Sequence, residues 1–245
     1  MAIAAKISST ELTAQVASRF VDQYFEARLI NAPGTSYEPG ITVDASFLAF
    51  EVPAGTGGYQ RQVIGYTAGD VSNYADDGVS LTTKATIFPQ NGSATAIDFT
   101  HAALVWSSGN VTALDAAGTV PSAGANGTYT NIPIDSTDGS GVGLVVDLTI
   151  ANLGASAGDW ILTIVNSGYD YAAGDVLIIN EGTLAGLGAV VAGAGPLAFG
   201  VAAASTSTND GNILAVAQTS AAASIVAGNE AIFYWNLKQF GYYAV

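Results

Sequence analysis

The sequence predicts an all-β fold: an antiparallel β-sandwich, jelly-roll-like, with one N-terminal helix and an inserted small β module. Three observations predict it. Apolar and polar residues alternate over many short segments, and clusters of Gly, Asn, Asp and Ser separate these segments. The regular alternation of strand and helix signals that marks a parallel α/β sheet is missing. The 245 residues suffice for one large β domain or two modest ones.

The one convincing helix pattern covers residues 8–29. Ser8 and Glu11 make a capping box at its start. Apolar residues then recur at four-residue spacing, at Leu12, Val16, Phe20 and Tyr24. A second set, Val21, Phe25 and Leu29, widens the stripe, so one helix face should pack on a core. Asn31–Gly34, which contains Pro33, should end the helix.

After the helix the apolar period changes to two. Ile41–Ala49 alternates in this way and predicts a strand with one buried face, which Gly55–Gly58 should end. Further predicted strands are Tyr59–Tyr66, Val79–Phe88, His101–Trp106, Val142–Ile150, Trp160–Val165, Val176–Ile179, Leu197–Ala202, Ile213–Ala217 and Ala231–Leu237.

Composition also predicts the domain organisation. The segment from about Gly118 to Ser207 is richer in Gly and poorer in bulky residues than its flanks, and it opens with the turn-prone Ser122–Gly127. We expect it to be a separate unit inserted into the surrounding β domain. The expected domains are therefore a discontinuous anchoring sandwich, residues 1–117 and 208–245, and an inserted small β domain, residues 118–207.

Charge and residue usage exclude several functions. The chain has 20 Asp and Glu against 6 Lys and Arg, a net charge of −14, which disfavours nucleic-acid binding. It has no cysteine, which excludes disulfides, thiol nucleophiles and zinc–thiolate sites. Leu184–Ser207 is uncharged, but it is mostly Ala and Gly and Pro196 interrupts it. We expect a Gly-rich loop leading into a buried strand there, and no membrane span.

One ordered set of motifs matches a known group. After the helix and an aliphatic strand come Gly57–Gln62 (GGYQRQ), Ile87–Gln90 (IFPQ) and Thr100–Val105 (THAALV). Val226–Glu230, followed by Phe233 and Trp235, occupies the place of a closing aromatic strand. This order resembles small bacteriophage virion proteins of the tail fibre or structural type. The compact ending usual in that group is postponed here by roughly ninety residues, as an insertion would require.

A second set of motifs lies within the expected insertion. It comprises Gly127–Pro133 (GTYTNIP), Asn166–Tyr171 (NSGYDY) and Gly174–Ile179 (GDVLII). These segments resemble a small β module of structural proteins from phages that infect cyanobacteria. Gly168 and Gly174 would permit tight turns, Tyr169 would cover a small core, and Asp175 would bond backbone amides.

The residues that could support catalysis have simpler structural explanations. His101 is the only histidine and lies in an apolar strand without a nucleophile elbow, so we expect a hydrogen-bonded structural histidine. Arg61 should form a partly buried ion pair or clamp a backbone carbonyl. Carboxylate pairs for glycoside hydrolysis fall in turn-like contexts, namely Asp76 with Asp77, Asp135 with Asp138, and Asp170 with Asp175. We expect no enzyme activity, catalytic residue, cofactor or metal site.

Aromatic residues give the remaining contact candidates. Phe233 and Trp235 share one strand face, with Tyr234 on the other, so one face should belong to the core. The end of the chain could instead dock on a neighbouring subunit through Phe240, Tyr242, Tyr243 and Val245. An alternative function, recognition of host-surface polysaccharide by a tail fibre module, would need exposed aromatic residues, with Trp106 and Trp160 as candidates.

The phage resemblance implies a virion structural protein on the particle exterior, as capsid decoration, knob or fibre. It would be made in the host cytoplasm and would assemble with capsid or tail proteins and with itself, as a homo-oligomer. The inserted unit would then point outward, where it could meet a host-surface glycan.

Overall fold

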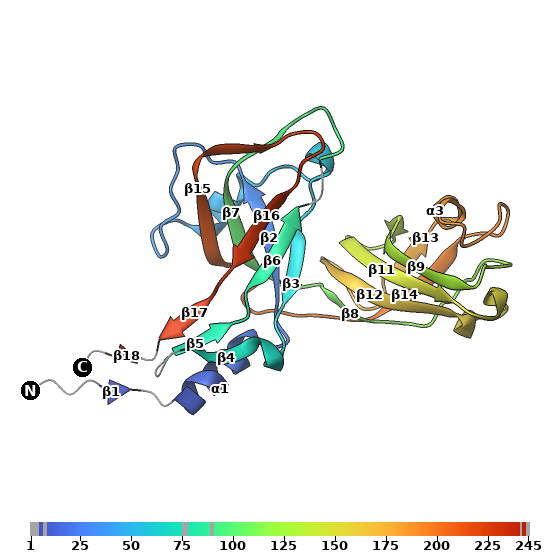
Figure 1. Cartoon of the computed structure of the whole chain (residues 1–245). Helices are drawn as coiled ribbons and strands as arrows, with labels where there is room; N and C mark the ends of the chain where they lie inside the picture. Colours follow the sequence, from blue (N-terminus) through green and yellow to red (C-terminus); the bar gives the residue numbers. More distant parts are fainter. Residues whose placement is uncertain (1–4, 7–8, 75–77, 89–90, 241, 244–245) are drawn as a thin grey trace, which may run out of the picture. The chain divides into compact units, whose positions relative to one another are not determined.

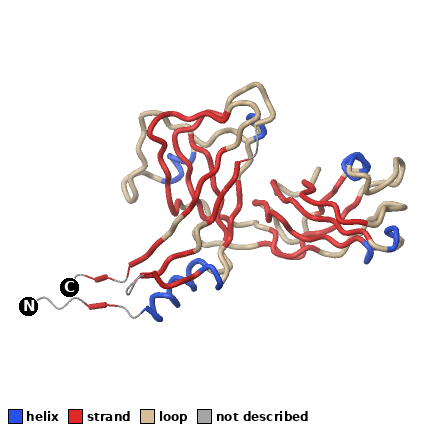
Figure 2. Tube along the Cα trace, in the orientation of Figure 1, coloured by secondary structure: helices blue, strands red, loops and turns tan. Residues whose placement is uncertain are grey.

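A computed structural model of the chain describes residues 5–6, 9–74, 78–88, 91–240 and 242–243. These residues form mainly antiparallel strands, and helix is restricted to short segments (Figure 1, Figure 2). The predicted all-β, sandwich-like fold with an N-terminal helix is therefore confirmed. The chain divides into two compact units, unit 1 with residues 1–106 and 209–245, and unit 2 with residues 107–208.

Within its described residues, unit 1 contains the α-helices α1 (Ser9–Phe20) and α2 (Asp44–Leu48) and the 3-10 turns Thr56–Gly58 and Ala68–Asp70. Its described strands are β1 (Ala5–Lys6), β2 (Tyr24–Ile30), β3 (Gln62–Gly65), β4 (Val71–Tyr74), β5 (Gly78–Leu81), β6 (Lys84–Phe88), β7 (Ile97–Ser107, ending in unit 2), β15 (Ile213–Ile225), β16 (Ala231–Trp235), β17 (Lys238–Phe240) and β18 (Tyr242–Tyr243).

Strand β7 is buried on both faces of the four-stranded sheet β15-β7-β2-β3. Ala102, Leu104 and Trp106 point into the large core of unit 1, which also holds Leu12, Val16 and Phe20 of α1. Ala103 and Val105 point the other way, into a smaller core that Phe47 of α2 helps to cover. The alternation of side chains along a strand thus gives this sheet two cores.

The helix predicted over residues 8–29 is wrong in its second half. Helix α1 ends at Phe20, and residues 24–30 form strand β2, paired with β3. The chain turns at Asp22, whose φ of 59° is left-handed and cannot continue a helix. Phe25 and Leu29 fit a period of two as well as a spacing of four, so only strand pairing decides between the two patterns. The expected cap residue Ser8 lies outside the described residues.

The strand predicted over Ile41–Ala49 is also wrong. Residues 44–48 form the short helix α2, and of the five predicted inward residues only Phe47 is buried. Ile41 is 77% exposed and Val43 65%, so the alternation does not mark a buried sheet face. Asp44 instead fixes this segment, since its carboxylate accepts hydrogen bonds from the Tyr37 hydroxyl and from the Ile213 amide.

Most other predicted strands are present, with shifted ends. Val142–Ile150 and Val176–Ile179 have the predicted bounds, whereas Val79–Phe88 is two strands, β5 and β6. Strand β3 is shorter than predicted, and β7, β12 (Trp160–Tyr169), β14 (Leu197–Ala204) and β15 are longer. Five of the described strands between residues 71 and 240 were missed: β4, β8 (Val111–Leu114), β9 (Gly127–Pro133), β10 (Ser136–Thr137) and β17. Several of these are short or Thr- and Gly-rich, so their apolar alternation is weak.

Unit 2 consists of two sheets around an aliphatic core. Its strands are β8 (Val111–Leu114), β9 (Gly127–Pro133), β10 (Ser136–Thr137), β11 (Val142–Ile150), β12 (Trp160–Tyr169), β13 (Val176–Ile179) and β14 (Leu197–Ala204). They form the sheets β10-β13-β14-β8 and β12-β11-β9, whose facing side chains make one core. The unit also contains helix α3 (Glu181–Gly186) and 3-10 turns at Asn152–Gly154 and Ala157–Asp159.

Two details of unit 2 bear on the sequence-based expectations. Residues 107–117, expected in the outer module, belong to unit 2 in this division, because β8 pairs with β14.

The uncharged stretch 184–207 runs from α3 through Gly-rich turns into β14, a strand with its odd-numbered residues Leu197, Phe199 and Val201 buried. Among the described residues, no helix is long and apolar enough to span a membrane.

Candidate functional site

The Gly-Gly-Tyr-x-Arg-Gln segment begins with a turn that requires glycine. Gly57 has a φ of +60°, and a Cβ at this position would lie 2.7 Å from Asn91 Oδ1 and 2.8 Å from the Ile97 side chain. Gly58 also has a positive φ, of +87°. These glycines therefore let the chain turn closely against the start of β7.

Tyr59, which follows this turn, is a buried core residue with a satisfied hydroxyl. The hydroxyl accepts a hydrogen bond from the Leu29 amide and donates one to Glu51 Oε1, both at 3.0 Å. Its ring stacks on Phe88 of the Phe-Pro motif, with centroids 5.9 Å apart. Burial, and next the charge of Glu51, raise the pKa of Tyr59 well above its ordinary value. Tyr59 and Phe88, from two of the motif segments, thus meet in one core.

Arg61 belongs to a network of two arginines and two glutamates. Its guanidinium contacts Glu51 at 2.8 Å and Glu26 at 3.1 Å, as the expected partly buried ion pair. Arg28 contacts the same two carboxylates, at 2.8 Å from Glu26 and 3.5 Å from Glu51. Glu26 is only 2% exposed, and its two cationic neighbours compensate its burial.

The Thr-His pair occupies the central strand β7. Thr100 Oγ1 accepts the Ala32 amide at 2.9 Å, donates to the Ile30 carbonyl at 3.3 Å, and lies 2.8 Å from His101 Nδ1. His101 is 1% exposed, and its Nε2 has no hydrogen-bond partner among the described residues. Burial lowers the pKa of His101 below its ordinary value of 6.5. The ring is therefore a neutral, buried imidazole with one unsatisfied nitrogen.

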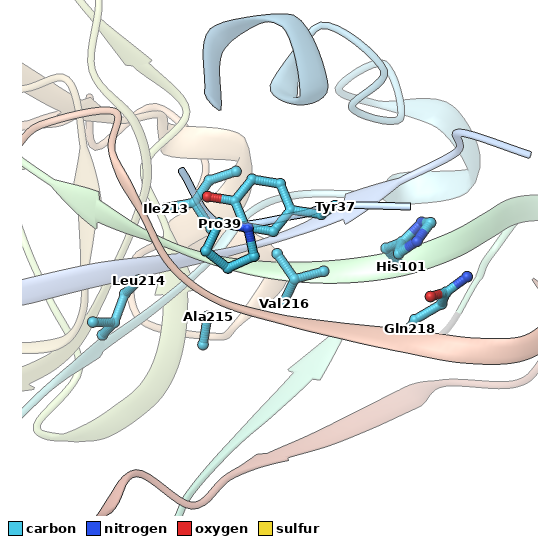
Figure 3. Close-up of a pocket in the computed structure, with 8 residues that line it drawn as sticks. All are labelled: Tyr37, Pro39, His101, Ile213, Leu214, Ala215, Val216 and Gln218. Carbon is cyan, nitrogen blue, oxygen red and sulfur yellow. The ribbon is translucent and has the colours of Figure 1, made fainter. Parts of the chain in front are cut away.

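A cavity of about 240 Å³ lies beside this imidazole (Figure 3). It is lined by residues of the 31–43 loop, of β7 and of β15, namely Tyr37, Pro39, His101, Ile213, Leu214, Ala215, Val216 and Gln218. Gln218 lies directly opposite His101 in the β15–β7 pairing. Tyr37 donates its hydroxyl to Asp44 at 2.7 Å, and burial together with this carboxylate raises the pKa of Tyr37 to about 12.

The second set of motifs also builds structure, within unit 2. Gly168 has a φ of +60°, and a Cβ there would lie 2.6 Å from the Val142 carbonyl oxygen. Tyr169 is 6% exposed, but the buried tyrosine that belongs to the core cluster of unit 2 is Tyr171. Asp175 accepts the Ala172 amide at 2.9 Å in the turn that contains Gly174, also as expected.

The described carboxylate pairs serve turns and strand ends. Asp135 accepts hydrogen bonds from the Asn180 amide and the Thr183 hydroxyl, and Asp138 accepts one from the Val176 amide. Asp76 and Asp77 lie outside the described residues. Within the described ranges, no group of three or more His, Cys, Asp or Glu side chains could hold a metal ion.

The two tryptophans proposed as glycan contacts are buried. Trp106 is 4% exposed and stacks on Phe20 in the core of unit 1. Trp160 is 3% exposed, and its indole nitrogen donates to the Gly154 carbonyl. The alternative function, polysaccharide recognition, required these rings to line an open groove, and core packing covers them instead.

The candidate contact residues at the chain end are only partly described. Phe240 lies in β17, and Tyr242 and Tyr243 lie in β18, which pairs with β1. The structure describes the backbone of these three residues and not their side chains, and Val245 lies outside the described residues. In the preceding strand, Trp235 is buried and Tyr234 is 70% exposed, as the predicted alternation requires.

Sequence reasoning missed the cavity beside His101. Its walls come from residues 37–39, 101 and 213–218, and only the pairing of β15 with β7 brings these segments together. No local sequence pattern identifies Gln218 or Tyr37 as a cavity residue, because Gln218 lies in an ordinary strand sequence and Tyr37 in an ordinary loop sequence. Comparisons with protein-family models, with curated proteins and with solved structures found no match to this chain.

Proposed function

We propose that the chain is a structural protein of a bacteriophage particle, carried on the particle exterior and assembled through protein–protein contacts. In this proposal unit 1 anchors the protein to capsid or tail proteins, and unit 2 is the displayed part. The support comes from the ordered motifs of the sequence and from the role of each motif residue in the fold.

The observation that carries the proposal is the structural role that residues of the first motif set, within Gly57–Gln62, Ile87–Gln90 and Thr100–Val105, have in the core of unit 1. Gly57 permits a close turn, Tyr59 packs on Phe88, and Arg61 neutralises buried carboxylates. Thr100 bonds two backbone groups. These residues are committed to packing, so the motif describes a scaffold and not a reactive site. A scaffold of this kind suits an assembly protein.

Exposed apolar residues on the strands of unit 2 are also in keeping with assembly. Ile161 and Val165 of β12 are 52% and 49% exposed, and Val142 of β11 is 41% exposed. A protein contact over these strands would bury their apolar side chains and gain the free energy of that burial.

The direct test is to locate the protein on intact particles. Mass spectrometry of particles purified from the phage that encodes the chain should detect it, and cryo-electron microscopy should place unit 1 against the particle wall. A deletion should yield particles that lose stability or a surface feature, and purified protein should restore it. Detection in the infected cell but never in purified particles would contradict the proposal.

The alternative function, polysaccharide recognition by a receptor-binding module, loses its two candidate residues because Trp106 and Trp160 are buried. A glycan array with the isolated full chain separates the two functions. Binding to a host polysaccharide would favour the alternative, and the absence of binding together with particle attachment would favour assembly.

A further inference from the structure

Two asparagines of this chain precede a glycine, and the fold holds them in different ways. Asn126 precedes Gly127 at the start of β9, and it is exposed. Asn91 precedes Gly92 in unit 1, and it is only 1% exposed. An Asn-Gly pair is chemically reactive because glycine has no Cβ, so its backbone nitrogen can approach the preceding carboxamide closely. The surroundings of each pair therefore decide whether it reacts.

The side chain of Asn91 is fixed at both of its polar atoms. Its Nδ2 donates to the Thr95 carbonyl at 2.7 Å and to the Ile225 carbonyl at 2.8 Å. Its Oδ1 accepts the Ser93 amide at 2.9 Å. Departure of Nδ2 would break two hydrogen bonds of a buried group and leave their acceptors unpaired, which is costly. We therefore expect no reaction at Asn91 in the folded chain.

The side chain of Asn126 is held at its oxygen alone. Its Oδ1 accepts the Leu153 amide at 2.6 Å, and its Nδ2 makes no hydrogen bond with the described part of the chain. The Leu153 amide polarises the carboxamide, and it would stabilise the negative charge that develops on Oδ1 when Cγ is attacked. Because Asn126 is exposed, water can give Nδ2 the proton with which it leaves. Asn126 thus offers an activated carbon and a free leaving group.

The attacking group is the backbone nitrogen of Gly127. Gly127 is the first residue of β9, and it pairs with Ile150, the last residue of β11. Strand β9 lies at the edge of the sheet β12-β11-β9, so only the end of one strand pair has to open to free this nitrogen. Such fraying needs much less free energy than global unfolding. The nitrogen and the Asn126 carboxamide are neighbours in the chain, so they react as one molecule.

We propose that Asn126 is a site of self-modification by deamidation. The Gly127 nitrogen forms a bond to Cγ of Asn126 and gives up its proton to water. The bond from Cγ to Nδ2 breaks, and Nδ2 takes a proton and leaves as ammonia. Water then opens the cyclic succinimide, at Cγ to give isoaspartate's isomer aspartate, or at the backbone carbonyl carbon of Asn126 to give isoaspartate. The reaction needs water alone, and the proposal is independent of the virion assignment.

The two products differ in their effect on unit 2. Aspartate leaves the backbone unchanged, and its carboxylate can still accept the Leu153 amide. Isoaspartate continues the chain through the former side chain, which adds one carbon to the backbone directly before β9. This extra atom would displace β9 from its register on β11. The isoaspartyl form should therefore exchange the amide hydrogens of β9 faster than the unmodified chain does.

The test compares the two Asn-Gly pairs in the full chain, incubated at mildly alkaline pH in H₂¹⁸O and then analysed by peptide mass spectrometry. In the folded chain the Asn126 peptide should gain solvent ¹⁸O and contain isoaspartate, and the Asn91 peptide should not. In urea, where the fold restrains neither side chain, both peptides should react.

Three outcomes would overturn the proposal. The first is an unmodified Asn126 in the folded chain, and the second is reaction of both asparagines there at one rate. The third is an Asn91 that stays unmodified in urea as well, since the fold would then not be the cause of the difference. Aspartate without any isoaspartate would indicate direct hydrolysis of the carboxamide, and it would also contradict the succinimide.

Two variants identify the attacking nitrogen. Gly127→Ala should keep the fold, because the atom nearest to the new Cβ is the Tyr129 hydroxyl oxygen at 3.5 Å. Its methyl group hinders the nitrogen and should slow the reaction of Asn126 about tenfold, which corresponds to ~1.4 kcal/mol in the barrier. Gly92→Ala, with nothing within 4 Å of the new Cβ, is the matched control and should leave this rate unchanged. Equal rates in the two variants would contradict attack by Gly127.

Discussion

The two units of this chain satisfy their carboxylates in different ways. Unit 2 has eight acidic residues and no Lys, Arg or His, whereas unit 1 holds all six Lys and Arg and the other twelve of the 20 acidic residues. In unit 1, Glu26 and Glu51 pair with two partly buried arginines, and Asp70 pairs with Lys84 at 2.9 Å. Among the described residues of unit 1, these three carboxylates are neutralised by ion pairs with Lys or Arg.

In unit 2 the carboxylates bind the backbone instead. Six of the eight accept a backbone N–H, namely Asp135, Asp138, Asp147, Asp159, Asp175 and Glu181. Such bonds hold turns and strand ends together and need no cation. The cores also differ, since the core of unit 1 is rich in aromatic rings whereas that of unit 2 is mainly aliphatic. A strongly acidic chain can thus fold without balancing its charge.

The largest expected effect comes from breaking the ion-pair network of unit 1. Arg61→Met should lower the free energy of unfolding by about 3–5 kcal/mol, because it leaves Glu26 buried with one cation fewer. Urea unfolding followed by hydrogen exchange should show the loss in unit 1. Glu38→Gln, at an exposed carboxylate, is the control. A loss confined to unit 2 would contradict the distinction between the units.

The next effect tests the tight packing of unit 2. Gly168→Ala should destabilise by about 2–3 kcal/mol, since the residue has a positive φ and the new Cβ would meet the Val142 carbonyl at 2.6 Å. Gly174→Ala is the matched control, because its φ is also positive but nothing lies within 4 Å of the Cβ. Thermal unfolding should show a larger loss of stability for Gly168→Ala than for Gly174→Ala. Equal losses would show that backbone strain, and not the close contact of the new Cβ, causes the destabilisation.

Lowering the pH should destabilise unit 1 before unit 2, because unit 1 contains the single histidine of the chain. Burial lowers the pKa of His101, so below pH 6.5 the unfolded chain binds a proton that the folded chain does not. The stability of unit 1 is therefore complete above pH 6.5 and falls below it, by at most about 1.4 kcal/mol per pH unit. NMR titration of the imidazole should give a midpoint below 6.5. A midpoint at or above 6.5 would be incompatible with a neutral buried ring.

The smallest effect concerns an exposed turn of unit 2. Hydrogen bonds from Asn152 and Ser156 hold the pKa of Asp159 below its ordinary value. Its contribution to stability is therefore present above the unfolded pKa, about 3.9, and is lost as the pH falls through the folded pKa. Asp159→Asn should be slightly less stable than the unmodified chain at pH 7 and equal to it at pH 2. A constant difference across this range would rule out the charged hydrogen bonds as the cause.

The sequence by itself determined the fold class and much of the strand content. Alternation and turn residues sufficed for Val142–Ile150 and Val176–Ile179, whose ends are as predicted. It also indicated that Arg61 would be paired, since a partly buried guanidinium needs an anion wherever it lies. Local patterns carry this information for two reasons. Side chains alternate along any strand, and burying a charge costs free energy, whichever segment of the chain packs against it.

Only the tertiary structure decided the rest. Phe25 and Leu29 fit a helix and a strand equally, and pairing with β3 made them a strand. Trp106 and Trp160 could have lain on a surface, and core packing buried them. His101 and Gln218 are more than a hundred residues apart, and only the β7–β15 register places them side by side at a cavity. Such long-range pairing depends on the whole chain, so no local pattern encodes it.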